Sequence, residues 1–281
     1  MPSVAERLKQ VTLKVERAKK HILDLQGQVQ AFLHGNPQPY LVGPKRDPET
    51  RRLHYCLTRV EPTPICLPLV AGDAVQNMMS ALDHLAYQIV CSDTGDNPPN
   101  PNWIYFPIQD TADKYEAKKH GKMEGASKET FEAIDTLRPY KGGNDELWAL
   151  YRLNNIEKHR LLITVGSMYH SMNIAAAIIP EFEKAIATDP KMAPFKGTTF
   201  DTFLNTFFSP SDVLFPLKVG DIVFTDLPDA EFNENLQFRF NVALYEPEIV
   251  KAQSILETLH QLTALVEGIV SALTPRLRDT G

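Results

Sequence analysis

Four stretches of the chain carry hydrophobic residues at three- and four-residue steps, which is the spacing of one face of an α-helix. These stretches are residues 3–34, 68–92, 145–166 and 247–275. Helices of this length bury their apolar faces best against one another. The pattern therefore predicts a bundle of about four long helices.

Residues typical of helix ends stand at the borders of these stretches. Ser3 and Glu6 have the spacing of a capping box, and Asn144 can cap a helix that begins at residue 145. Pro247 suits the first turn of the last helix, and Pro275 ends that helix.

The remaining segments alternate in polarity and are rich in β-favouring residues. Residues 39–61 read as a hairpin around the turn sequence PKRDPET, and strands are expected through 170–245. Alternation is clearest in QFRFNVALY, residues 237–245, where every second residue is apolar. We expect 39–61 and 211–245 to form one antiparallel sheet that packs on the bundle.

The predicted fold class is therefore α+β, in a single domain that spans residues 1–281. The helical bundle comprises 1–36, 68–92, 145–166 and 247–275. The β-rich portions are 38–62 and 170–245. Between them, residues 103–108 are expected to be extended, and 110–137 to hold one or two short helices.

Composition narrows the class of protein. The net charge is −6, which argues against a general nucleic-acid coat and gives no reason to expect DNA binding, although a local basic cleft stays possible. The three cysteines include no CxxC pair, as expected of reduced thiols in the cytoplasm. The first 20 residues lack the apolar stretch of a signal peptide, and no apolar run is long enough for a membrane span.

Polar residues interrupt the third helix in the sequence RLNNIEKHRLL, residues 152–162. Helical spacing places Arg152, Asn155 and His159 on one face, framed by apolar residues. The second helix has a similar patch, in which Asn77 and His84 share a face and Asp83 lies beside His84. Histidine with a carboxylate can form a proton-transfer pair. Two patches of this kind also suit a purely structural hydrogen-bond network, so both interpretations stay open.

The segments "ALDHL" and "KHR" resemble those of a group of uncharacterised bacterial proteins that carry the same two helices. More distantly, the helical part is similar to HEPN domains, α-helical bundles that are often dimeric. Their ribonuclease members place an Arg and a His on one helix with four to six residues between them, and Arg152 and His159 are separated by six. The resemblance implies metal-independent RNA cleavage, with His159 in proton transfer and Arg152 on the phosphate.

Other chemistries have less support in the sequence. Glu257 and His260 have the spacing of a di-iron ligand pair, but the other helices do not complete the set. A single metal bound by Asp83, His84 and His159 remains an alternative. Nucleotide-binding loops and a G-x-S-x-G nucleophile elbow are missing from the sequence, and no cofactor is expected.

The resemblance, together with the two polar patches, therefore implies a HEPN-like bacterial protein that interacts with or cleaves RNA and forms a homodimer. Its candidate catalytic residues are His159, Arg152, Asn155, His84, Asp83 and Asn77. Two alternatives remain, a non-catalytic homo-oligomeric binding module and a helical bundle that binds a small molecule or metal.

Overall fold

The computed structural model describes residues 3–160, 162–173, 184, 186–188, 191, 207–208 and 214–278. The chain divides into two compact units. We call them the helical unit, made of residues 1–29, 65–165 and 244–281, and the β-rich unit, made of 30–64 and 166–243. The predicted α+β class is confirmed.

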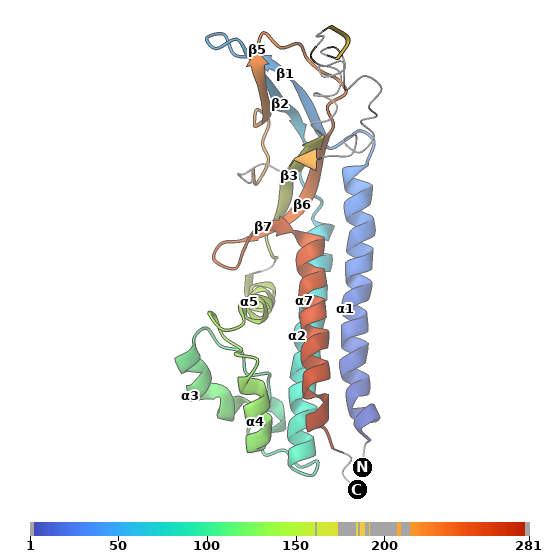
Figure 1. Cartoon of the computed structure of the whole chain (residues 1–281). Coiled ribbons are helices and arrows are strands. Elements are labelled where there is room, and N and C mark those ends of the chain that lie inside the picture. Colours follow the sequence, from blue (N-terminus) through green and yellow to red (C-terminus); the bar gives the residue numbers. More distant parts are fainter. Residues whose placement is uncertain are drawn as a thin grey trace. The chain divides into compact units, whose positions relative to one another are not determined.

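Three long helices run side by side in the helical unit (Figure 1). They are α1 (Val4–Leu33), α2 (Cys66–Asp93) and α7 (Ile255–Leu273). The shorter α5 (Asp145–Arg160) packs across α2 and α7, and Figure 1 shows it end-on. A bundle of four aligned long helices is therefore not confirmed.

The predicted caps of the first and third helices are confirmed. The Glu6 N–H donates to the Ser3 hydroxyl over 3.3 Å, and the Glu6 carboxylate accepts from the Ser3 N–H over 2.7 Å. Asn144 accepts from the Leu147 N–H over 3.0 Å. These contacts satisfy donors that the first helical turn leaves unpaired.

Two predicted helix boundaries are wrong. The third helix ends at residue 160 rather than 166, because backbone groups beyond it bond to other segments: the Thr164 N–H donates to Glu246 over 2.7 Å, and the Tyr245 N–H donates to the Thr164 carbonyl over 3.0 Å. The last helix begins after Ser254, which caps it, rather than at Pro247. Residues 250–254 form a strand instead.

Short helices complete the helical unit. They are η1 (Pro101–Trp103), α3 (Ala112–Lys122), α4 (Lys128–Asp135) and η3 (Thr274–Arg276). Asp93, at the end of α2, holds the start of α4 by accepting from the Ser127 N–H and the Thr130 hydroxyl, both over 2.8 Å. Among the described residues, no helix is long and apolar enough to cross a membrane.

The strands form two sheets rather than the single sheet that we expected. One has the order β1-β2-β5, from Tyr40–Arg46, Arg52–Val60 and Ile222–Pro228. The other has the order β4-β3-β6-β7, from Phe207–Phe208, Val165–Asn173, Phe238–Glu246 and Val250–Ser254. The β1–β2 hairpin is confirmed, but β5 and β6 belong to different sheets because β5 pairs with β2 and β6 with β3. Part of the strand expected near residues 172–179 lies outside the described residues.

Aromatic rings make up much of the core of the β-rich unit. Tyr55 is fully buried, and its ring lies 5.6 Å from that of Phe224, 5.3 Å from Phe232 and 5.7 Å from Phe238. The Tyr40 ring lies 4.8 Å from that of Phe240. Ring pairs at such distances add to the stability that burial alone provides.

Candidate functional site

The two polar patches predicted from the sequence lie on helices that touch, since α2 packs directly against α5. Gly72 on α2 permits this close approach. A Cβ at Gly72 would lie 2.6 Å from Oε1 of Glu157 on α5, so a larger residue would collide with that carboxylate. Burial and the nearby charge of Asp73 raise the pKa of Glu157, partly offset by a backbone hydrogen bond from Ile163.

Arg152 is engaged inside the helical unit. Its Nη1 lies 3.7 Å from Oδ1 of Asp110, and the indole N–H of Trp148 donates to the same oxygen over 3.2 Å. Burial acts to raise the pKa of Asp110, but the Trp148 hydrogen bond and the charges of Arg152 and Lys114 outweigh it and lower the pKa. Arg152 thus helps to hold the segment before α3 against α5.

His159 and Asn155 are placed differently from Arg152. His159 is exposed near the end of α5, and Asn155 is half-buried. Within the described residues, neither side chain makes a hydrogen bond or ion pair. Arg152 and His159 are about 10 Å apart along the helix axis, from seven residues at the usual helical rise.

Asp83 on α2 anchors an extended segment. Its Oδ1 accepts from the Phe106 N–H over 3.0 Å. Burial raises the pKa of Asp83, while the Phe106 hydrogen bond and the charges of Lys158 and Lys122 partly oppose that shift. Lys158 belongs to α5, so its interaction with Asp83 joins charges of the two predicted patches.

Lys122, at the end of α3, is the second cation near Asp83. Its ammonium group donates to the Ile108 carbonyl over 3.1 Å and lies 5.3 Å from the centre of the Tyr151 ring. Burial lowers the pKa of Lys122, and the charge of Asp83 partly restores it.

The other two candidate residues on α2, Asn77 and His84, differ in their interactions. Asn77 donates to the Asp73 carbonyl of its own helix over 2.8 Å. His84 is half-buried, and burial together with the charge of Lys14 on α1 lowers its pKa. A neutral imidazole at neutral pH can accept a proton.

Asp83 and His84 line one surface pocket of about 470 Å³ in the helical unit. Its walls come from α1, α2 and the segment 101–105, and the lining residues are Gln10, Ser80, Asp83, His84, Tyr87, Gln88, Pro101, Asn102, Ile104 and Tyr105. A pocket with converging polar groups and two shifted pKa values is a candidate for binding or catalysis.

Exposed aromatic rings occur in the same segment. Trp103 is 72% exposed and Tyr105 is 46% exposed. From the sequence we predicted only that this segment is extended and missed any functional role. The signal was present, since Trp103 and Tyr105 alternate with Ile104 and Phe106, so in an extended segment they occupy the outer face, where polar residues are usual.

The structure brings together only some of the predicted residues. Asp83 and His84 share a pocket, whereas Arg152 bonds toward Asp110 and His159 is exposed. In the described part of the chain, no three His, Cys, Asp or Glu side chains are grouped closely enough to hold a metal ion. The alternative in which Asp83, His84 and His159 share one metal is therefore wrong.

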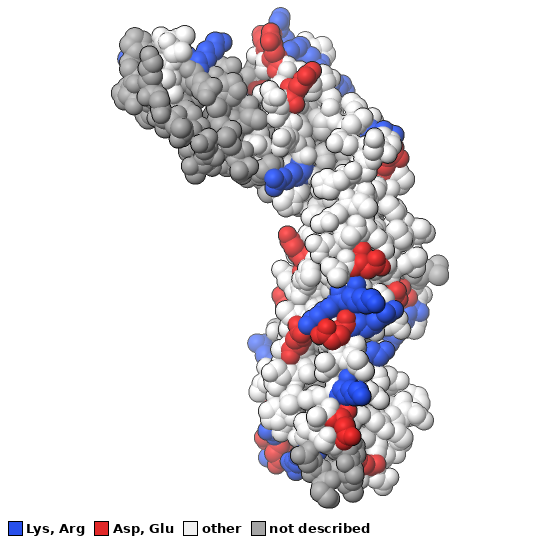
Figure 2. All heavy atoms as spheres, turned by 90° about the vertical axis from the view of Figure 1, so that its right-hand side faces the viewer, with Lys and Arg blue, Asp and Glu red and all other residues white. Residues whose placement is uncertain are grey.

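Figure 2 shows basic and acidic side chains scattered among uncharged ones on the face of the helical unit that carries α1. Lys19, for example, lies 3.2 Å from Glu16 and 2.6 Å from Glu267. In the described part of this face the acidic side chains interrupt the basic ones, unlike the continuous basic stripe that binds nucleic acid.

Comparisons with known proteins returned no match to a protein-family model, to a curated protein or to a solved structure.

Proposed function

We propose that this is a HEPN-like bacterial protein of the cytoplasm that binds single-stranded RNA through the helical unit. The observation that carries the proposal is the pocket in which Asp83 and His84 lie beside the rings of Tyr87 and Tyr105. Bases of single-stranded nucleic acid stack on aromatic side chains, and each stacked base contributes about 1–3 kcal/mol.

Each part of this surface has a chemical role in the proposal. Trp103 and Tyr105 supply exposed rings for stacking, and the amides of Gln10 and Asn102 supply hydrogen bonds to base edges. Lys158, exposed on α5, offers a charge to a phosphate.

Cleavage is the stronger form of the proposal. His84, neutral at pH 7, would accept the proton of a ribose hydroxyl. By the HEPN resemblance, His159 would transfer a proton and Arg152 would contact the phosphate. The pairing of Arg152 with Asp110 favours a positioning role for Arg152 instead. A homodimer, typical of that family, would suit the exposed Leu13 and Leu23 on α1, which are 58% and 69% exposed.

Binding and cleavage of a labelled single-stranded RNA, with EDTA present, test the proposal. Trp103→Ala should weaken binding about tenfold, from the loss of one stacked base. In the cleavage form of the proposal, His84→Ala and His159→Ala should each lower the cleavage rate. His260→Ala is the matched control, because His260 is also an exposed helical histidine but lies on α7. Equal binding by wild type and Trp103→Ala would refute the RNA-binding proposal.

A second candidate is a non-catalytic homo-oligomeric binding module. The observation that favours it is that Arg152, Glu157 and Asn77 are all used within the helical unit. Asn154, only 3% exposed, is likewise interior. In that case His159→Ala would change neither the cleavage nor the binding of the labelled RNA, and sedimentation would show a stable oligomer. The pocket would then remain available to a small molecule, which is the third alternative.

A further inference from the structure

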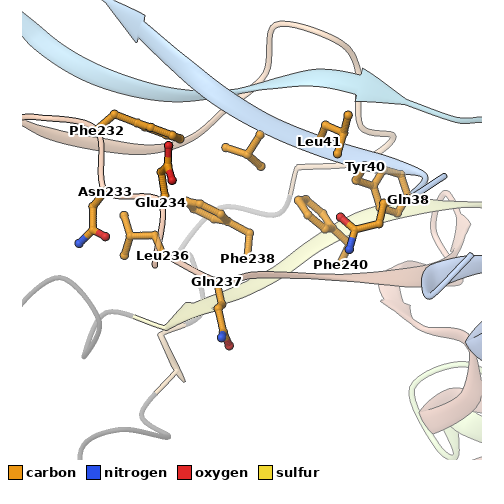
Figure 3. A pocket seen from close by; sticks show the side chains of 11 residues that line it. Gln38, Tyr40, Leu41, Phe232, Asn233, Glu234, Leu236, Gln237, Phe238 and Phe240 are labelled. Carbon is orange, nitrogen blue, oxygen red and sulfur yellow. The ribbon is translucent and has the colours of Figure 1, made fainter. Parts of the chain in front are cut away.

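The β-rich unit has a pocket of its own, of about 420 Å³, between β1 and the segment that leads into β6 (Figure 3). Four aromatic residues line it, namely Tyr40, Phe232, Phe238 and Phe240. Among the residues that the structure describes, the remaining lining is aliphatic or amide, and Glu234 is its one charged side chain. A ligand that fits this lining must suit aromatic walls and one negative charge.

Glu234 lines the pocket together with the aromatic rings of Phe232 and Phe238. Figure 3 shows its carboxylate between the side chains of Phe232 and Phe238. Phe232 is 38% exposed, so part of its ring is open to a ligand. Within the described residues, Glu234 forms no ion pair or hydrogen bond, and its carboxylate is open to solvent.

The segment that carries Phe232 and Glu234 is held in place before any ligand arrives. The Tyr55 hydroxyl, reaching from the buried face of β2, accepts from the Asn233 N–H over 2.9 Å. The Asn233 side chain accepts from the Asn235 N–H over 2.9 Å, which fixes the turn that follows. A preorganised site loses less conformational freedom when a ligand binds.

We infer that this pocket binds a small alkylammonium ion, with Glu234 as its counter-ion and the rings of Phe232 and Phe238 as its walls. Aromatic faces attract cations because the ring quadrupole is negative there, and quaternary ammonium groups are commonly bound in this way. An unpaired carboxylate among the rings adds charge complementarity and excludes anions.

The neighbouring pocket limits where the cation can lie. That pocket, of about 570 Å³, shares Gln38, Tyr40, Phe238 and Phe240 with the first but is also lined by His34, His170 and Arg239. The guanidinium of Arg239 there opposes a second cation. The alkylammonium ion is therefore assigned to the end of the first pocket near Phe232 and Glu234.

Titration of the full chain with choline, followed by calorimetry or by NMR, tests the inference. The matched control ligand is 3,3-dimethyl-1-butanol, which has nearly the same shape and no charge. Choline should bind at millimolar concentrations, and the neutral alcohol should bind at least about fivefold more weakly, the difference that a cation–π contact and a counter-ion provide.

Three variants locate the site. Glu234→Gln should weaken choline binding about threefold, as expected of a solvent-exposed ion pair, and Phe232→Leu, which keeps an apolar side chain but removes the ring, about twofold. Glu231→Gln, an exposed neighbour outside the pocket lining, should leave binding unchanged. Far-ultraviolet circular dichroism checks that each variant stays folded. Equal binding of the neutral alcohol, equal effects of the two Glu→Gln variants, or no choline binding would each overturn the inference.

Discussion

The contact between Gly72 and Glu157 makes a sharp prediction about how α2 and α5 pack. Replacing Gly72 by Ala removes backbone freedom from a helical position, which by itself stabilises a protein by about 0.5–1 kcal/mol. In this protein the added Cβ would meet the Glu157 carboxylate, with only 2.6 Å to its Oε1. Glu157 must then turn away from α2.

At pH 4, the pH at which the variants are compared, Glu157 is mostly protonated, so the displaced carboxyl group loses the backbone hydrogen bond from Ile163 without relieving a buried charge. A hydrogen bond of this kind contributes about 0.5–1.5 kcal/mol. We therefore expect Gly72→Ala to be neutral or destabilising by up to about 1 kcal/mol in the wild-type chain. In a Glu157→Ala background the collision is gone, and the same substitution should stabilise by about 0.5–1 kcal/mol.

Urea unfolding of the four proteins of this double-mutant cycle, followed by helical circular dichroism, measures the coupling. The expected coupling free energy is about 1 kcal/mol or more. If Gly72→Ala changes the free energy of unfolding equally in both backgrounds, the Gly72–Glu157 contact does not govern the packing of α2 against α5, and the reasoning is refuted.

Three further predictions follow from the helical unit. Asp83→Ala leaves the Phe106 N–H without its acceptor, so it should cost about 1–3 kcal/mol and speed hydrogen exchange at the Phe106 amide, whereas Asp83→Asn keeps a carbonyl acceptor and should cost less. Burial and the charge of Lys14 lower the pKa of His84, so this histidine should titrate below 6.5 when followed by NMR. Because the unfolded chain then binds the proton more tightly than the folded chain, the free energy of unfolding should fall as the pH falls through 6.5. His84→Gln should reduce that loss of stability. The Glu157 carboxyl has a raised pKa, so its contribution to the stability of the fold is present below pH 4.5 and is lost as the pH rises. Glu157→Gln should therefore stabilise the chain relative to wild type at pH 7. Near pH 4 the two proteins should be equally stable. A Glu157→Gln variant with the same stability profile as wild type between pH 4 and 7 would contradict the last of these.

The helices were predictable because their signals are local. Apolar spacing, the Ser3–Glu6 capping box and the Asn144 cap act within a few residues of the backbone that they stabilise. The β1–β2 hairpin was predictable for the same reason, since its two strands adjoin one turn. The ends of α5 and α7 were not, because the backbone groups around Thr164 and residues 250–254 bond to strands that are distant in sequence.

The candidate site was likewise predictable only where its features depend on local sequence. The sequence predicted polar groups on two helices and placed Asp83 next to His84 on one of them. In the structure Asp83 and His84 line the same pocket. The sequence could not show that Arg152 bonds toward Asp110, or that Trp103 and Tyr105 are exposed near that pocket. Those facts depend on how α3 and the 101–108 segment pack on α2 and α5.

By itself, then, the sequence determined the α+β class, the presence of the long helices, the N-terminal caps of α1 and α5, and the polar residues that one helix face shares. Tertiary structure alone decided that the strands form two sheets, that Gly72 receives Glu157, and that Phe232 and Glu234 meet in one pocket. The physical reason is range. Helical hydrogen bonds and caps join residues within about four positions of each other. Strand pairing and side-chain packing also join residues that are far apart in the sequence, and the local sequence does not specify which of them come into contact.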